Sequence, residues 1–305
     1  SSSCLHCAAP SSDLDRSKKV VVCAGGSITH AAVSTNYLNI LDDWLNRPHK
    51  AAKRFSAVPL DPANSSGDSS SDDENAAASP RKNVHLKWTF VNAGVNGDLV
   101  YNLLQRVQPI IRCRPDFITI GVGSNDVNAS LNPKVASHYK TAKRLPQAPD
   151  LELFCSSYHA LLETLLTSTA ARIGVLSLPI IGENLTTLAN TRVKEYCAEL
   201  RQLVRELGAQ HADRVVYLPL NEAQTAFLQR AQSASRPPPV FSPGLVSSTM
   251  LRAGFRHYVL RHSWDQISQR FGFLLTTDHM HLNTVGAEML ARLVRRFLVG
   301  ESVEL

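Results

Sequence analysis

The sequence predicts an α/β protein, a three-layer αβα sandwich with a five-stranded parallel sheet between two layers of helices. Short apolar runs alternate five times with helical stretches, which is typical of a parallel sheet covered on both faces. The chain of 305 residues is 44% hydrophobic, enough to bury one large core. Small, polar residues that favour turns follow three of the five runs, at the sheet edge where ligands collect.

The predicted strands are short runs rich in Val, Ile, Leu and aromatic residues. A helical stretch follows each of them, the last one only after a longer interruption. The strands are expected at 20–24, 84–92, 116–121, 172–178 and 214–218, and the helices at 29–46, 98–112, 152–168, 186–207 and 284–298.

A flexible tail precedes the predicted domain, and two insertions interrupt it. Residues 1–17 are polar, rich in serine and without periodicity, so the domain is expected to span 18–300. Residues 61–80 hold five acidic groups and no Val, Leu, Ile, Met or aromatic residue, which predicts a disordered acidic insert over about 56–82. A helical insertion is expected over about 231–273.

Charge and composition exclude several classes of function. The chain has 32 Lys and Arg against 26 Asp and Glu, a formal charge of +6, but these basic residues are scattered, so no nucleic-acid binding is expected. No apolar stretch is long enough to cross a membrane. Cys4 and Cys7 are the only close pair among six cysteines. Their place in the serine-rich tail favours an inert role over a redox or metal role, so no metal and no cofactor is predicted.

Ser27 lies where the first predicted strand meets a helix. Its hydroxyl would stand above the sheet edge, and its backbone N–H would lie in the first helical turn, where negative charge is favoured. A serine in this place can be a nucleophile or a plain helix N-cap. A phosphate-binding loop of the Walker type is excluded, because no Gly-Lys-Ser or Gly-Lys-Thr follows.

A nucleophilic serine needs a general base, and residues 277–283 offer one. Asp278 and His281 are three residues apart. In a turn, this spacing lets the carboxylate accept a hydrogen bond from one imidazole nitrogen while the other nitrogen faces a serine hydroxyl. His279 is a competing base, although we expect it to point elsewhere or to pack beside Met280.

Two further residues at strand exits are suited to stabilising an oxyanion. Gly97 can offer its backbone N–H, and Asn125 its side-chain amide. Taken singly, Gly97 is also explained as a turn glycine and Asn125 as a turn cap. The order Ser, Gly, Asn, His at successive strand exits favours a catalytic role for all four residue types.

This order resembles the SGNH hydrolase superfamily, also called GDSL lipases and esterases. Four blocks in register form a strong signal where any single block would be weak. The resemblance spans about 18–298, and it implies a flavodoxin-like sheet and hydrolysis of acyl esters without a cofactor or metal. The blocks are GGSIT at 25–29, NAGVNG at 92–97, GSND at 123–126 and DHMH at 278–281.

The resemblance implies a role for each candidate residue. Ser27 becomes the nucleophile, His281 the general base and later acid, and Asp278 the partner that orients His281. The backbone N–H groups of Ser27 and Gly97 and the side chain of Asn125 become the oxyanion hole.

One position departs from the family pattern, because Gly26 stands where the family usually has Asp. That Asp is not the triad carboxylate, so the departure concerns the support of the Ser27 turn and leaves the nucleophile assignment intact. Glu183, near the exit of the fourth strand, is expected to be structural or at the pocket edge.

The predicted activity is serine-dependent hydrolysis of a small-molecule or lipid ester through an acyl-enzyme. The alternatives are an acyltransferase with the same triad and a catalytically silent SGNH-like binding module. Residues 231–273 mix apolar and basic side chains, and they form either a packed helical insertion or a mobile cover that binds an acyl chain or a lipid surface. Peripheral contact with lipid is therefore open, and no oligomeric state is predicted.

No single compartment is predicted. The sequence begins with Ser and contains N-glycosylation sequons at Asn64, Asn128 and Asn184, features compatible with secretion or with an endomembrane lumen. Asn128 and Asn184 lie close to predicted strand exits, where a glycan would obstruct the site, and a cytoplasmic location is the alternative.

Overall fold

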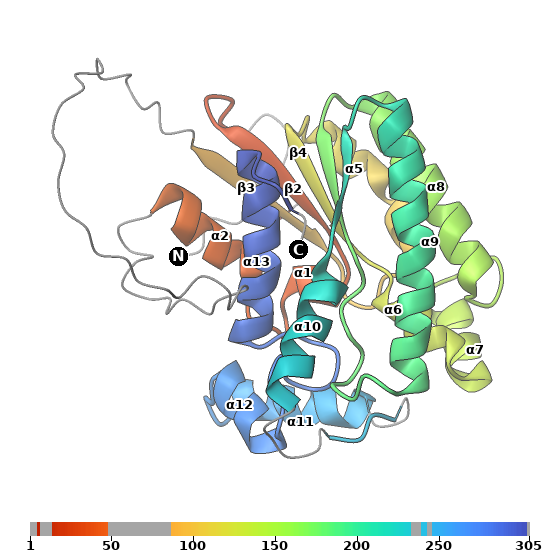
Figure 1. Cartoon of the computed structure of the whole chain (residues 1–305), viewed down its shortest axis with the longest axis vertical. Coiled ribbons are helices and arrows are strands. Elements are labelled where there is room, and N and C mark those ends of the chain that lie inside the picture. Colours follow the sequence, from red (N-terminus) through yellow and green to blue (C-terminus); the bar gives the residue numbers. More distant parts are fainter. Residues whose placement is uncertain (1–4, 7–13, 48–86, 233–238, 243–245, 304–305) are drawn as a thin grey trace, which may run out of the picture.

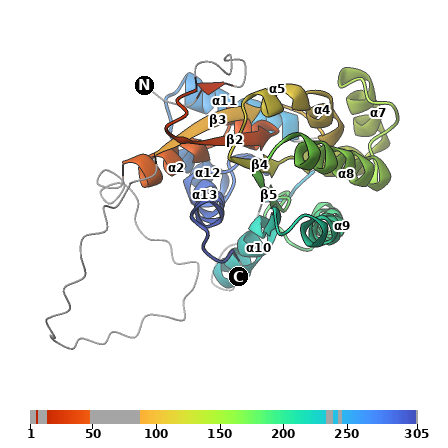
Figure 2. The same cartoon turned by 90° about the horizontal axis from the view of Figure 1, so that it is seen from above.

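The computed structural model describes residues 5–6, 14–47, 87–232, 239–242 and 246–303 (Figure 1). One parallel sheet lies between two layers of helices (Figure 2), which confirms the predicted α/β sandwich. Its strands are β1 (Leu5–His6), β2 (Lys19–Gly25), β3 (Trp88–Gly94), β4 (Phe117–Gly121), β5 (Arg172–Leu176) and β6 (Val215–Leu218).

The strand order across the sheet is β1-β3-β2-β4-β5-β6. The five predicted strands correspond to β2 to β6. In this order the first of them lies between the second and the third, which is the flavodoxin-like arrangement. This arrangement confirms the predicted sheet.

Part of the predicted N-terminal tail contacts the fold. Strand β1 was not predicted, and it pairs in parallel with the outer edge of β3. Leu14 is buried in the core, and the Arg16 guanidinium donates to the carbonyl oxygens of Cys113 and Arg114. Polar composition alone did not reveal these contacts, because a short edge strand is held by its backbone groups and needs no apolar periodicity.

Helices cover both faces of the sheet (Figure 2). Helices α4, α5, α8 and α9 pack on one face, and α2, α10 and α13 pack on the other. The helices are α1 (Ser27–His30), α2 (Tyr37–Asn46), α4 (Val100–Gln105), α5 (Val107–Arg112), α6 (Ser124–Ser130), α7 (Pro133–Ala142), α8 (Leu151–Ser168), α9 (Leu188–Gln210), α10 (Leu220–Gln232), α11 (Val246–Tyr258), α12 (Trp264–Phe271) and α13 (Thr284–Val299).

Strand β2 supplies the middle of both core layers. Val20 and Val22 face the layer of α8 and α9, whereas Val21 and Cys23 face α2 and α13. Because successive side chains of a strand point to opposite faces, a strand covered on both sides is apolar throughout. This double burial explains why the strand runs were readable in the sequence.

Two predicted helices are divided, and three helices were missed. The helix expected at 29–46 ends at His30, Ala31 takes a left-handed φ of 64°, and α2 begins after Asn36, whose side chain accepts from Leu38 N. The helix expected at 98–112 is divided between α4 and α5 at Arg106. Helices α6, α7 and α10 were not predicted.

The predicted insertions are described only in part. The acidic insert expected at about 56–82 lies outside the described residues, whereas the insertion at 231–273 contains α11 and α12. Among the described residues, no helix is long and apolar enough to span a membrane. The described part of the chain likewise holds no group of His, Cys, Asp or Glu side chains arranged for a metal ion.

Candidate active site

Ser27 opens helix α1 immediately after β2 ends. The residue that caps this helix is Gly26, whose carbonyl accepts from His30 N, and Gly26 N donates to Gly121 O at the end of β4. Ser27 is therefore the first residue of the helix and not its cap. Its half-buried hydroxyl is free to serve another partner.

That partner is His281, although 254 residues separate it from Ser27 along the chain. His281 Nε2 lies 2.9 Å from Ser27 Oγ, and His281 Nδ1 lies 2.7 Å from Asp278 Oδ2. Asp278 is fully buried and His281 is nearly so. A carboxylate, an imidazole and a hydroxyl thus form one continuous chain of hydrogen bonds that ends at the accessible serine.

The turn 278–281 fixes the carboxylate of Asp278. Its Oδ1 accepts from Met280 N at 3.1 Å and from His281 N at 2.9 Å, while His279 between them takes a left-handed φ of 81°. Burial would raise the pKa of Asp278, but the charge of His281 and these hydrogen bonds hold that pKa below its ordinary value. Asp278 is therefore ionised and oriented toward His281.

Glu183 anchors the segment that leads into this turn. Its carboxylate accepts from the backbone N–H groups of Leu274, Leu275 and Thr276 at 2.7 to 2.9 Å. Burial raises its pKa against the opposing effect of these donors. Of the two roles expected for Glu183, structural or at the pocket edge, these hydrogen bonds favour the structural one.

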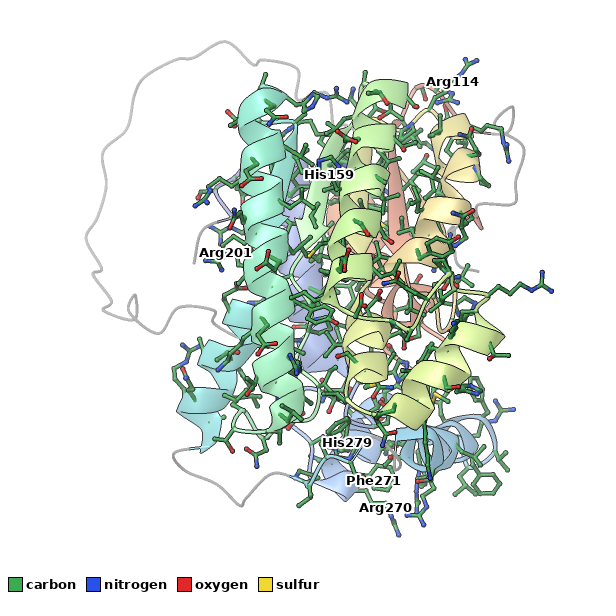
Figure 3. All side chains as sticks on the ribbon, turned by 90° about the vertical axis from the view of Figure 1, so that its right-hand side faces the viewer. Arg114, His159, Arg201, Arg270, Phe271 and His279 are labelled. Atoms are coloured by element: carbon green, nitrogen blue, oxygen red, sulfur yellow. The ribbon has the colours of Figure 1, made fainter. Side chains whose placement is uncertain are left out.

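His279, the competing base, packs away from the serine. Its ring lies edge-on to Phe273, with centroids 4.7 Å apart, and 5.8 Å from the ring of Phe241. Figure 3 shows His279 at the same end of the molecule as Phe271 of α12. Burial lowers its pKa. His281 is thus the histidine that reaches Ser27.

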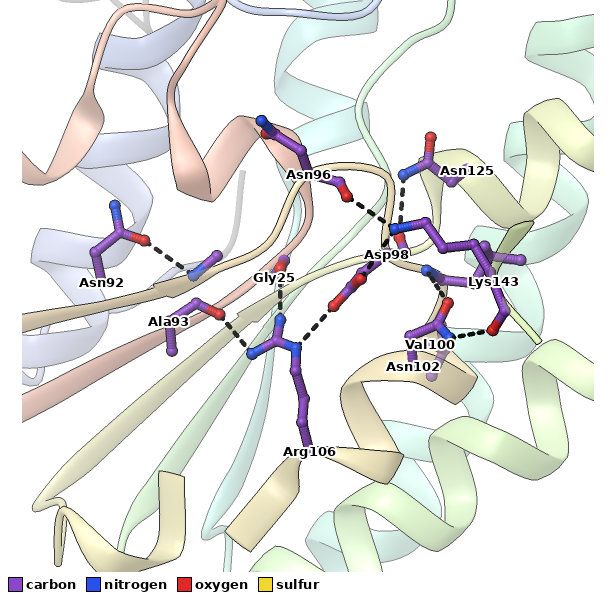
Figure 4. Close-up of polar contacts among 12 residues, drawn as sticks. Gly25, Asn92, Ala93, Asn96, Asp98, Val100, Asn102, Arg106, Asn125 and Lys143 are labelled. Carbon is purple, nitrogen blue, oxygen red and sulfur yellow. Dashed lines mark hydrogen bonds and ion pairs between the residues drawn. The ribbon is translucent and has the colours of Figure 1, made fainter. Parts of the chain in front are cut away.

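Asn125, at the start of α6, presents its amide in a fixed orientation. Its Nδ2 donates to the carbonyl oxygen of Asp98 at 3.0 Å (Figure 4). Its Oδ1 accepts from Tyr139 Oη at 2.9 Å. One Nδ2 hydrogen is therefore engaged by Asp98, and the other is available to a ligand.

Gly97 lies in the turn after β3, with a left-handed φ of 73°. A side chain there would be strained, and its Cβ would lie 3.1 Å from Lys143 Nζ. Within the described part of the chain, neither Gly97 N–H nor Ser27 N–H donates a hydrogen bond. The structure thus leaves two backbone donors and one amide donor unengaged at the carboxyl edge of the sheet.

An ionic cluster that the sequence did not reveal, formed by the buried Asp98 and the partly exposed Arg106 and Lys143, supports this edge (Figure 4). The Arg106 guanidinium donates to Asp98 Oδ2 at 2.7 Å and to the carbonyl oxygens of Ala93 and Gly25 at 2.9 and 3.1 Å. Lys143 Nζ donates to Asp98 Oδ1 at 3.3 Å and to Asn96 O at 2.9 Å. The cluster ties the end of β2 to the turn that contains Gly97.

We expect Arg106→Met to lower kcat on the order of ten- to a hundredfold with little change in KM, because the Gly97 turn would lose the side-chain link to β2 and keep only the backbone bond from Val95 N to Gly25 O. The matched control is Arg214→Met, since Arg214 donates to the carbonyls of Leu166, Thr169 and Ala171 at the opposite end of the sheet. Steady-state kinetics of both folded variants check this. If Arg106→Met and Arg214→Met lost kcat equally, Arg106 would contribute to the general stability of the fold and not to the positioning of the Gly97 turn.

Asp126, next to Asn125, is a buried acid with few partners. Burial raises its pKa to about 8, and backbone donors such as Val100 N only partly oppose this. An acid whose pKa is higher in the folded state than in the unfolded state loses stability as pH rises. The free energy of unfolding should therefore fall between about pH 4 and pH 8 because of Asp126.

The variant Asp126→Asn has no proton to lose and should lack this fall. Urea unfolding of both proteins across that pH range isolates the contribution of Asp126 as the difference between the two curves. A difference that stays constant with pH would contradict the raised pKa.

Gly26, the departure from the family pattern, lies beside Asn125. A Cβ at this position would lie 3.6 Å from Asp98 O and 3.8 Å from Asn125 Nδ2, which are ordinary contacts. A Cβ would thus fit beside the amide without a clash, and Asp98 and Tyr139 orient Asn125 without a side chain at residue 26.

A family model described as the GDSL-like lipase/acylhydrolase family matches residues 23–239. This match includes Ser27, Gly97 and Asn125, whereas Asp278 and His281 lie beyond its end. No curated protein matches the sequence.

Three solved structures illustrate the likeness of the fold. An acetyl xylan esterase, AlAXEase, is similar with a TM-score of 0.55 and 15% identity, covering 92% of this chain and 99% of that one. Axe2, an acetylxylan esterase from Geobacillus stearothermophilus, has a TM-score of 0.54 and 15% identity, covering 91% and 93%. LAE5, an alpha/beta hydrolase from the metagenome of Lake Arreo, Spain, has a TM-score of 0.51 and 14% identity, and the match covers 94% of this chain and 97% of that one. At these identities the likeness concerns the fold.

Proposed function

Because the chain belongs to the GDSL-like lipase/acylhydrolase family and is an ester-hydrolysing enzyme, we propose a mechanism for this hydrolysis. In this mechanism the acyl group of the ester is bound covalently to Ser27 as an acyl-enzyme. The observation that carries this proposal is the hydrogen-bond chain from Asp278 through His281 to Ser27 Oγ. Ser27 is the nucleophile, His281 the general base and later acid, and Asp278 the group that orients His281.

The position of the proton on the His281 ring determines whether His281 can act as a general base toward Ser27. With Nδ1 protonated and donating to Asp278, Nε2 keeps its lone pair toward Ser27 Oγ and accepts the hydroxyl proton as Ser27 attacks the ester carbonyl. The proton then passes from Nε2 to the leaving alcohol. Water repeats the sequence on the acyl-enzyme, and the acid is released.

The developing oxyanion needs donors that are already in place. We assign this role to the backbone N–H groups of Ser27 and Gly97 and to Asn125 Nδ2. The engagement of Asn125 with Asp98 and Tyr139 supports the assignment, because a fixed amide does not have to reorient during the reaction. Neither a metal nor a cofactor takes part in this scheme.

The substrate class is a carboxylic ester. The preferred length of its acyl group can be measured with a series of esters. Two of the similar structures are described as acetyl xylan esterases. We expect the purified full chain to hydrolyse p-nitrophenyl esters in a series from acetyl to palmitoyl. Absence of hydrolysis across the series, with acyl transfer to an added alcohol, would replace this proposal by the acyltransferase alternative.

A further inference from the structure

Helix α11 and the residues after it expose a row of large apolar side chains. Leu251 is 75% exposed, Phe255 and Tyr258 are each 55% exposed, and Val259 is 59% exposed. Residues 251, 255, 258 and 259 have the spacing of one helix face. The sequence left open whether this insertion is packed or covers a lipid, and the structure places these side chains in solvent.

The other face of the helix holds it in place. Ala253 is fully buried, and the His257 ring stacks on Trp264 of α12 with centroids 3.8 Å apart. His257 Nδ1 also lies 2.9 Å from His262 O. The apolar row is therefore presented outward by a packed helix pair.

Arginines accompany the row, and acidic residues do not. Arg252 follows Leu251 and Arg261 follows the exposed Leu260, and both arginines are exposed, whereas the half-buried Arg256 lies over the Phe271 ring of α12, 5.6 Å from its centroid. No Asp or Glu occurs between 246 and 264. A second copy of the same face would bring these arginines against one another. A lipid bilayer with anionic headgroups complements both the apolar row and the arginines, because it has negative charge at its surface and an apolar interior.

The row lies beside the proposed active site. Tyr258 Oη donates to the carbonyl oxygen of Ala32, in the loop that follows α1 and Ser27. Figure 1 shows α11 and α12 beyond the end of the sheet at which α1 lies.

We propose that this surface docks on an anionic lipid bilayer, with Leu251, Phe255 and Val259 entering the acyl-chain boundary and the arginines contacting lipid phosphates. Contiguous exposed apolar side chains rimmed by charge mark interaction surfaces. Docking in this way holds Ser27 at the membrane surface, where the ester of a lipid is within reach. The proposal goes beyond ester hydrolysis and does not depend on turnover.

The test is sedimentation of the full chain with vesicles of phosphatidylcholine alone or mixed with phosphatidylserine. The wild type is expected to bind the mixed vesicles more tightly, by about fivefold for each arginine engaged, and less tightly at high salt. The variant Leu251→Asp/Phe255→Asp should lose affinity by at least about tenfold, because charge replaces buried apolar area.

Leu188→Asp is the matched control, because Leu188 is 62% exposed on α9 and belongs to no such row. This variant and Ser27→Ala should bind vesicles as the wild type does, which separates docking from catalysis. All variants except Ser27→Ala should hydrolyse a soluble ester normally, which shows that they are folded.

Three outcomes would overturn the proposal. The wild type could remain in the supernatant with both kinds of vesicle, or Leu251→Asp/Phe255→Asp could bind as the Leu188→Asp control does. In the third outcome, the wild type does not bind vesicles but forms a dimer that light scattering detects, and the variant Leu251→Asp/Phe255→Asp does not form this dimer. That result would assign the face to a second copy of the chain.

Discussion

Replacing Ser27 by alanine should abolish ester hydrolysis, with a loss of kcat on the order of 10⁶ as for other serine nucleophiles of this type. The hydroxyl is the one group of the hydrogen-bond chain that bonds to the substrate, and alanine leaves His281 without a proton to accept. The measurement is initial-rate kinetics on the best p-nitrophenyl ester.

The matched control for this prediction is Ser156→Ala on α8. Ser156 Oγ is exposed and donates to the carbonyl oxygens of Glu152 and Leu153 in its own helix. This variant should keep full activity. A Ser27→Ala enzyme that retained more than about a hundredth of the activity would contradict the nucleophile assignment, because the loss expected for a serine nucleophile is on the order of 10⁶ in kcat.

Asp278→Asn should lower kcat by about 10⁴ while the enzyme stays folded. An asparagine amide can donate to His281 Nδ1, so the imidazole proton moves to Nε2 and faces Ser27 Oγ, where a lone pair is needed. The remaining Oδ1 can still accept from Met280 N and His281 N, which keeps the turn. Kinetics and circular dichroism of the variant check both parts of this expectation.

Asp116→Asn is the matched control, because it also replaces one carboxylate by an uncharged amide. Asp116 accepts from Lys19 and from Val20 N at the opposite end of the sheet, so its amide variant should keep its kcat. If Asp278→Asn lost less than about tenfold in kcat, Asp278 would not set the tautomer of His281.

The positions of the proposed catalytic residues were predictable because of the topology of the sheet. Ser27, Gly97 and Asn125 each follow a parallel strand, and the carboxyl ends of parallel strands meet at one edge. The pair Asp278 and His281 is visible as a local spacing. Double burial made the strands themselves readable, since every residue of β2 from Val20 to Ala24 is buried.

Other features depend on contacts that no local pattern encodes. Arg106 looks like an ordinary helical residue, yet it lies at the break between α4 and α5 and donates to carbonyls of β2 and β3. Asp98 gives no signal either, because its basic partners Arg106 and Lys143 are 8 and 45 positions away and have no helical spacing to it. The apolar spacing of α11 is the same for a buried face and an exposed one, so only the fold distinguishes them.

The most direct test of the central claim is covalent labelling with a fluorophosphonate, followed by intact-mass measurement and peptide mapping. The reagent reacts with a serine that a general base has activated, and it requires no knowledge of the natural ester. We expect one adduct per chain, located on Ser27 and absent from Ser27→Ala and His281→Ala. No adduct on the folded wild type, or an adduct on another serine, would contradict the assignment of Ser27 as an activated nucleophile.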